Sequence, residues 1–218
     1  MPIYNGIQYF TVSFNSIVGQ TFVDWELIIG INGHPQNSNV YNFVRCIISK
    51  YPQLTHKIKL IDYYYLSGKS NTLNKMLEEC QYDYVALLDV DDIWEKNKLK
   101  KQAVYLNTYD VIGSKCIYFN NNGECSNGPD LPLEDFSNFN FKLSNPIVNS
   151  SSIIRKNLCY WNNNINGIED YDLWLRLNRD GKKFYNCSDN LVAHRLHDES
   201  AFNSNGNSSM IQELLDKY

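Results

Sequence analysis

Short, continuous apolar runs alternate with segments of helical periodicity through the first half of the chain. The apolar runs lie at residues 25–31, 57–61 and 82–88, and turn residues bound them, which is typical of buried strands. The helical patterns lie at residues 6–19, 40–48 and 71–80, where Ser70 or Asn71 is suited to cap the third helix. Strands alternating with helices predict a parallel sheet that binds ligands at the carboxyl ends of its strands.

The second half is less regular. A hairpin is predicted around residues 120–123, another strand within residues 145–156, and a helix over residues 169–180 that Gly181 ends. A last short helix follows the polar stretch at residues 203–209.

Charge and composition exclude several classes of protein. A formal net charge of -4 leaves no general basic surface for nucleic acid, so we expect no nucleic-acid partner. The apolar segments are shorter than the roughly 20 residues of a membrane span, so none is predicted to be transmembrane. Six cysteines without a C-x-x-C pair favour neither a zinc site nor a redox motif. A reducing, cytoplasmic location is the simplest interpretation.

Three carboxylates follow the third predicted strand, in the segment YVALLDVDDIW at residues 84–94. Asp89, Asp91 and Asp92 are close enough to repel one another unless a positive group or much water lies beside them. Two aspartates one residue apart can hold a hard divalent cation that shares its ligand shell with substrate phosphates. In the alternative interpretation, Asp92 caps a helix that begins near Trp94 and the other two are merely solvated.

Five segments, in the order in which they occur along the chain, match motifs of a known protein family. They are MPIYNG at residues 1–6, QTFVDWELIIGING at 20–33, GKSNTLN at 68–74, LLDVDDIWEKNKLKKQ at 87–102 and GIEDYDLWLRLNRDGKKF at 167–184. Together they resemble the family 2 glycosyltransferases over most of the chain, to about residue 200. The resemblance implies a single α/β domain of the GT-A fold, a Rossmann-like fold with a mostly parallel central sheet flanked by helices. Residues 1–112 would form its nucleotide-binding half, and residues 113–218 would carry the acceptor site and the catalytic base.

The family implies inverting transfer of a hexosyl or deoxyhexosyl group from a nucleotide diphosphate to a glycan hydroxyl. By resemblance, the nucleotide slot includes Pro2, Tyr4, Asn32, Lys69 and Asp89. Asn32 stands where the family usually has an aspartate, and an amide both donates and accepts hydrogen bonds, so the identity of the base stays open. A UDP-linked donor is the default by resemblance, with GDP- and TDP-linked donors as alternatives.

For the metal, the resemblance makes Asp91 the direct ligand, places Asp89 at the ribose or the metal shell, and adds His197 from HRLHDES at residues 194–200. Imidazole suits Mn²⁺ better than Mg²⁺, which favours manganese. A surface histidine is the alternative for His197, and His194 is predicted to be structural.

For the base, the resemblance indicates Asp170, with Glu169 beside it at the start of a predicted helix. A helix start stabilises carboxylates, although acidic residues are also ordinary in a first turn. Trp161 lies in a polar loop just before this pair, and we expect it to stack on the acceptor sugar. Trp174 and Leu177 are predicted to belong to the core.

Two departures limit what the resemblance implies. The Q-x-x-R-W motif and membrane helices of processive members are missing from this sequence, which favours a single-addition enzyme or one domain of a longer enzyme. Because Asn32 replaces the usual aspartate, an alternative is a degenerate transferase that binds a sugar nucleotide or a glycan without turnover. A phosphotransferase of the haloacid dehalogenase kind is disfavoured, because its D-x-D follows the first strand.

Overall fold

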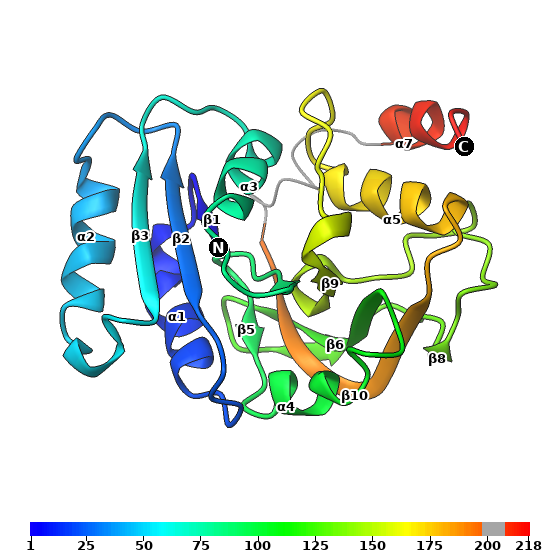
Figure 1. Ribbon diagram of the computed structural model, residues 1–218, viewed down its shortest axis with the longest axis horizontal. Coiled ribbons are helices and arrows are strands. Elements are labelled where there is room, and N and C mark those ends of the chain that lie inside the picture. The colour runs from blue at the N-terminus through cyan, green and yellow to red at the C-terminus, as the bar shows by residue number, and fades with distance from the viewer. Residues whose placement is uncertain (198–207) are drawn as a thin grey trace.

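The computed structural model describes residues 1–197 and 208–218, and its first sheet has the predicted parallel order. Strands β1 (Pro2–Ile3), β2 (Leu27–Asn32) and β3 (Ile58–Tyr63) lie side by side in that order. The register pairs Ile3 with Ile31 and Asn32 with Tyr63, so the carboxyl ends of these strands meet at one edge, where β2 and β3 end in Figure 1.

Three helices cover this sheet, as the helical patterns predicted. They are α1 (Phe10–Val18), α2 (Asn39–Ile48) and α3 (Lys69–Leu77). Ile29 and Ile31 of β2 belong to the same core cluster as the buried residues of α1 and α2, whereas Ile28 packs with Met76 of α3. Side chains alternate across a strand, so α1 and α2 cover one face and α3 covers the other.

The start of α3 differs from the prediction. Gly68, at φ 87°, precedes the first helical residue, and no side chain caps the helix. Ser70 lies within the first turn and donates a hydrogen bond to the carbonyl of Ile165 instead. The predicted cap at Ser70 or Asn71 is therefore wrong, because the glycine conformation turns the chain earlier.

The second sheet is mixed and has seven strands in the described residues. They are β4 (Tyr84–Ala86), β5 (Ile93–Trp94), β6 (Val111–Asn120), β7 (Cys125–Asn127), β8 (Glu134–Asp135), β9 (Ile153–Arg155) and β10 (Phe184–Leu196). The main order is β4-β9-β6-β10-β5, and only β6 and β10 are parallel. Strand β4 was expected in a parallel sheet with β2 and β3, but it lies in this second sheet and pairs antiparallel with β9.

The remaining predicted elements are present with adjusted bounds. The hairpin joins β6 to β7, and the strand expected within residues 145–156 is reduced to β9. Helix α5 (Glu169–Arg179) ends before Gly181, at φ 68°, as predicted. Helices α4 (Lys98–Ala103) and α7 (Ser208–Leu215) complete the described chain, while residues 203–207 of the predicted polar stretch lie outside it. Within the described ranges, the structure contains no helix long and apolar enough to span a bilayer.

Candidate active site

The segment after β4 lies against elements that are distant in sequence. A Cβ added to Gly6, just after β1, would lie 2.9 Å from the Val90 side chain. Lys69 is the first residue of α3, and Glu169 is the first residue of α5. The Lys69 ammonium contacts the carboxylates of both Asp89 and Glu169. The carboxyl end of β1, the acidic segment (residues 89–92) and the start of α5 therefore form one site, and Figure 1 shows α3, from which Lys69 extends, next to α5.

Asp89 is held by donors on both carboxylate oxygens. The Lys69 ammonium lies 2.8 Å from Oδ1, and the Asn149 amide donates to Oδ2 at 2.9 Å. The Asp89 amide donates to Ser150 Oγ. Burial alone would raise the pKa of Asp89, but Lys69 and Asn149 outweigh it and hold the pKa below its usual value.

The pKa of Lys69 lies above its ordinary value for the reciprocal reason. Burial would lower it, and the charges of Asp89 and Glu169 more than offset that effect. Lys69 is therefore a fixed positive charge between the acidic segment and α5.

Asp91 lies beside His197, with Oδ2 2.9 Å from Nε2. The two side chains are 23% and 10% exposed, respectively. Burial and the negative charges of Asp92 and Asp89 raise the pKa of Asp91. The structure thus brings together Asp91 and His197, two of the three residues that the resemblance assigned to the metal, one from each half of the sequence.

Asp92 is buried and does not cap a helix. Its carboxylate accepts a hydrogen bond from the Arg195 amide and lies 3.1 Å from His194 Nδ1, and the next helix begins only at Lys98. Burial would lower the pKa of His194, but the hydrogen bond and charge of Asp92 raise it to about 9. The capping alternative for Asp92 is therefore wrong, and His194 has the structural role predicted for it.

Arg195 is a central residue that the sequence reasoning missed. Its guanidinium lies 4.2 Å from the ring centroids of both Tyr9 and Phe119. Nε donates to the carbonyl of Asp91, and a terminal nitrogen donates to Asn121 Oδ1. The residue lies between the two histidines of HRLH, but its four partners come from three other segments of the chain, so no local sequence pattern predicts these contacts.

Two acidic neighbours at the start of α5 have different surroundings. Glu169 is buried, accepts a hydrogen bond from the Gly167 amide, and has Oε1 3.4 Å from Lys69. Asp170 is half-buried, and its Oδ2 accepts a hydrogen bond from the Asn145 amide at 3.3 Å. Burial, followed by the charge of Glu169, raises the pKa of Asp170 to about 6. Asp170 is thus the carboxylate with the proton affinity of a base that works near neutral pH.

Three of the residues predicted for the nucleotide, Pro2, Tyr4 and Asn32, lie in or next to β1 and β2, while Lys69 and Asp89 form the ion pair described above. Pro2 is in β1, and the register pairs Ile3 with Ile31. Tyr4, which is 61% exposed, and the buried Asn32 follow these two residues in their segments. The Tyr4 ring lies against Gly33, where an added Cβ would be 2.6 Å from it. His34 Nε2 contacts the Tyr4 carbonyl. An exposed ring beside a glycine turn is a surface on which a nucleobase can stack.

Trp161 is not available for stacking on an acceptor. Its side chain is 1% exposed and packs in the core cluster that includes Trp174 and Leu177. Asn74 exchanges two hydrogen bonds with the Trp161 backbone, which fixes the loop before α5 to α3. The prediction for Trp161 is wrong because the polar residues around it cover a buried ring, whereas the core roles of Trp174 and Leu177 are confirmed.

The donor set around Asp91 is compatible with a divalent cation. A carboxylate oxygen and an imidazole nitrogen lie side by side, and two further aspartates supply negative charge nearby. Residues 1–197 and 208–218 contain no group of three or more His, Cys, Asp or Glu residues arranged to hold a metal. If a divalent cation binds here, Asp91 and His197 would be two of its ligands, and substrate oxygens and water would complete the shell.

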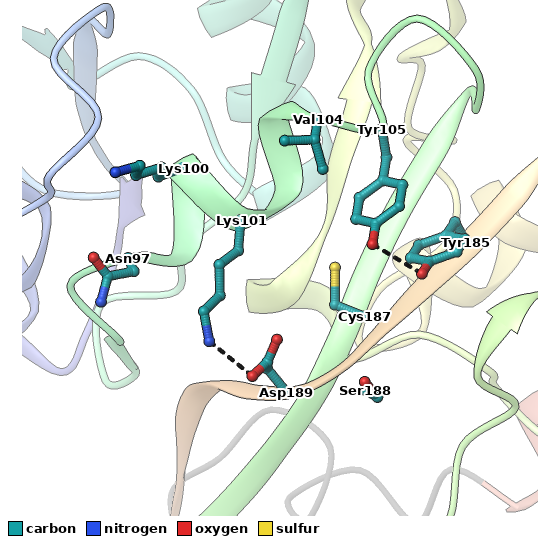
Figure 2. Close-up of a pocket in the computed structure, with 9 residues that line it drawn as sticks. All are labelled: Asn97, Lys100, Lys101, Val104, Tyr105, Tyr185, Cys187, Ser188 and Asp189. Carbon is teal, nitrogen blue, oxygen red and sulfur yellow. Dashed lines mark hydrogen bonds and ion pairs between the residues drawn. The ribbon is translucent and has the colours of Figure 1, made fainter.

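A separate pocket of about 500 Å³ lies between α4 and the start of β10. Figure 2 shows Lys101 paired with Asp189 there, and the hydroxyls of Tyr105 and Tyr185 bonded to each other. None of the predicted site residues lines it, and it lies at the end of β10 opposite His197.

Known proteins resemble this chain in sequence and in fold. It is 27% identical to the O-antigen biosynthesis glycosyltransferase WbnJ of Escherichia coli over an alignment of 207 residues. The alignment covers 92% of this chain and 79% of that protein. The crystal structure of S. aureus TarS 1-349 in complex with UDP-GlcNAc superposes with a TM-score of 0.71 at 18% identity, covering 98% of this chain and 63% of that one. The mannosyltransferase PcManGT from Pyrobaculum calidifontis, in complex with GDP-Man and Mn²⁺, superposes with a TM-score of 0.69 at 13% identity, covering 92% and 56%.

The chain thus spans less than two thirds of these two solved structures, whose likeness shows a GT-A fold. The sequence profile of glycosyl transferase family 2 matches residues 1–158, which include the whole acidic segment after β4. The protein is therefore a glycosyltransferase that belongs to glycosyl transferase family 2.

Proposed function

We propose that the protein is a metal-dependent, inverting and non-processive enzyme that moves a sugar from a nucleotide diphosphate, UDP by preference, to a glycan hydroxyl. The observation that carries this proposal is the Lys69 bridge between Asp89 and Glu169. It fixes the acidic segment, the candidate donor site, beside helix α5, whose second residue, Asp170, is the candidate base. The glycan acceptor is supported by the role of WbnJ in O-antigen biosynthesis.

On the donor side, Tyr4 and Asn32 would contact the nucleobase, and Asp89 would contact the ribose. Asp91 and His197 would hold the divalent cation, which when bound supplies positive charge next to the leaving diphosphate. The structures of relatives with UDP-GlcNAc and with GDP-Man and Mn²⁺ support a nucleotide-sugar donor and a metal.

On the acceptor side, Asp170 would accept the proton of the attacking hydroxyl. The hydroxyl oxygen forms a bond to the anomeric carbon as the bond to the diphosphate oxygen breaks and its electron pair leaves with the diphosphate. The proton passes to Asp170, whose pKa of about 6 keeps it largely ionised at neutral pH. Inversion requires the base and the leaving group on opposite sides of the sugar. Asp170 and Asp91 belong to separate segments, which Lys69 links through Glu169 and Asp89.

We also place the reaction in the cytoplasm. All six cysteines are free thiols, the state that a reducing compartment maintains.

The experiment that tests this function measures nucleotide release from UDP-, GDP- and TDP-sugars with Mn²⁺, with and without glycan acceptors. A transferase releases UDP slowly to water and faster with its acceptor, and Asp170→Asn abolishes the acceptor-dependent part. A degenerate binding protein would release none while still binding the donor. Release that is equal in the wild-type protein and in Asp170→Asn would remove Asp170 as the base.

A further inference from the structure

A single segment of the chain, residues 145–150, contacts both carboxylates on which the proposed function depends. The Asn145 amide donates to Asp170 Oδ2, and the Asn149 amide donates to Asp89 Oδ2. Ser150 Oγ accepts a hydrogen bond from the Asp89 amide. Residues 145–150 are therefore a bridge segment between the donor side and the base.

The bridge segment is itself anchored at both ends. The buried Asn186 of β10 donates to the carbonyl of Pro146, and the Trp94 indole donates to the carbonyl of Ser150 at 2.7 Å. These anchors are separate from the two asparagine side chains that reach the site, so the backbone position of Asn145 does not depend on its contact with Asp170.

The orientation of the Asn145 side-chain amide follows from the hydrogen bond that its oxygen accepts. Oδ1 accepts a hydrogen bond from the Ile147 amide at 3.3 Å, so Oδ1 is the oxygen and Nδ2, which faces Asp170, is the nitrogen. The side chain can therefore only donate to the carboxylate. A donor in this position favours the charged form of an acid and restricts rotation of the carboxylate.

We propose that Asn145 is a positioning residue, which orients the Asp170 carboxylate and keeps it ionised for proton abstraction from the acceptor. This inference rests on the proposed function, because it assigns Asn145 a role through the base. Nothing in the sequence pattern separates Asn145 from the many other asparagines of the chain.

Several groups besides Asn145 also affect the pKa of Asp170. Burial and the Glu169 carboxylate raise its pKa, while Lys69, the Tyr171 backbone amide and Asn145 lower it. Lys69 also contacts Asp89 and Glu169, and the Tyr171 amide belongs to the α5 backbone. Asn145 is thus the side chain that can be changed with the least disturbance to the donor side.

The test compares three variants. Asn145→Ala removes the donor to Asp170. Asn145→Asp keeps the size and the acceptor for the Ile147 amide, but adds a negative charge in place of the donor, so it serves even if the alanine variant folds poorly. Asn149→Ala is the matched control, because it removes the equivalent amide from Asp89 and leaves Asp170 untouched.

The first readout is the titration of the Asp170 carboxyl carbon by NMR in the free protein, assigned with Asp170→Asn. The wild-type pKa should lie near 6. We expect an upward shift of about one unit in Asn145→Ala, a larger upward shift in Asn145→Asp, and no shift in Asn149→Ala. An unchanged pKa in both Asn145 variants would overturn the inference, whether or not an acceptor has been found.

The second readout is the rising limb of kcat/KM against pH with a UDP-sugar and Mn²⁺. It should move upward with the NMR pKa, with rates recovering at high pH and with UDP affinity unchanged. A shift in the NMR pKa without a shift in this limb would mean that Asp170 is not the base, so the base assignment in the proposed function would fail together with the role of Asn145.

Discussion

At the scale of single residues, adjacent carboxylates in this site differ because of what surrounds each one. Glu169 is tied to Lys69 and to the Gly167 amide, whereas Asp170 is half-buried with an amide donor and carries a raised pKa. Asp89 is held by two donors, and its pKa is lowered. The same residue type is therefore suited to binding at one position and to proton transfer at another.

The pKa of Asp170 predicts how activity depends on pH. A base works only when ionised, so kcat/KM should rise about tenfold per pH unit below pH 6 and level off above it. Asp170→Asn should lower kcat by roughly 100- to 10,000-fold with UDP affinity retained. Steady-state kinetics between pH 5 and about 9 check this expectation.

Glu169→Gln is the matched control for Asp170. The amide keeps the size of the side chain but removes the negative charge that raises the pKa of Asp170, so the rising limb should move to lower pH. If the rising limb of kcat/KM against pH stays in place in Glu169→Gln, or is still present in Asp170→Asn, Asp170 is not the base.

Candidate site residues could be predicted from the sequence where they belong to a motif, but the residues that hydrogen-bond to them could not. Asp89, Asp91, His197, Glu169 and Asp170 could be named from the sequence, and the structure brings them into one region. Arg195, Asn145 and Asn149 were missed because their roles arise from contacts between distant segments. Hydrogen-bond partners more than 20 residues apart leave no local pattern to detect.

At the scale of elements, the buried Trp161 ring anchors the loop between β9 and α5 and is not exposed for acceptor binding. Trp161→Ala should lower the free energy of unfolding by about 3–5 kcal/mol, because it leaves a cavity in the core. Urea denaturation measures the loss, and Trp161→Phe should cost less. An unchanged midpoint with a raised acceptor KM would restore the stacking role.

The end of β10 positions the acidic segment through Arg195. Arg195→Met should weaken Mn²⁺ affinity in the presence of UDP by about 10- to 100-fold, because the Asp91 backbone loses its donor while both proposed metal ligands, Asp91 and His197, remain. Arg195→Lys should recover little, since an ammonium lacks the planar group that fits between Tyr9 and Phe119. Calorimetry with a thermal melt for each variant measures both effects, and unchanged Mn²⁺ affinity in folded Arg195→Met would refute this role.

The elements themselves were largely predictable because periodicity reports burial. The helices α1, α2 and α5 follow their apolar patterns, and β2 and β3 follow continuous apolar runs. The antiparallel pairing of β4 with β9 was not predictable, since a three-residue strand carries no signal for its partner.

At the scale of the whole molecule, the two proposed halves share a core. One buried cluster includes Ile29 and Trp94 from residues 1–112, and Cys116, Ile153 and Val192 from residues 113–218. A shared core couples the stability of the two halves, so the protein should unfold in one cooperative transition.

Scanning calorimetry tests that coupling. The calorimetric and van't Hoff enthalpies should agree, and tryptophan fluorescence should change at the same temperature as circular dichroism. Two separate transitions would mean that the halves are independent domains.

The central claim is that both halves meet in one metal-dependent nucleotide site, with Asp91 from the first and His197 from the second. The most direct measurement is a calorimetric titration with UDP, GDP and TDP, with and without Mn²⁺, of the wild-type protein, of Asp91→Ala, and of Asp83→Ala, which changes an exposed aspartate before β4. We expect one nucleotide to bind the wild-type and Asp83→Ala proteins only with Mn²⁺, and Asp91→Ala to lose this binding. Binding that ignores both Mn²⁺ and Asp91, or no binding of any nucleotide, would contradict the account.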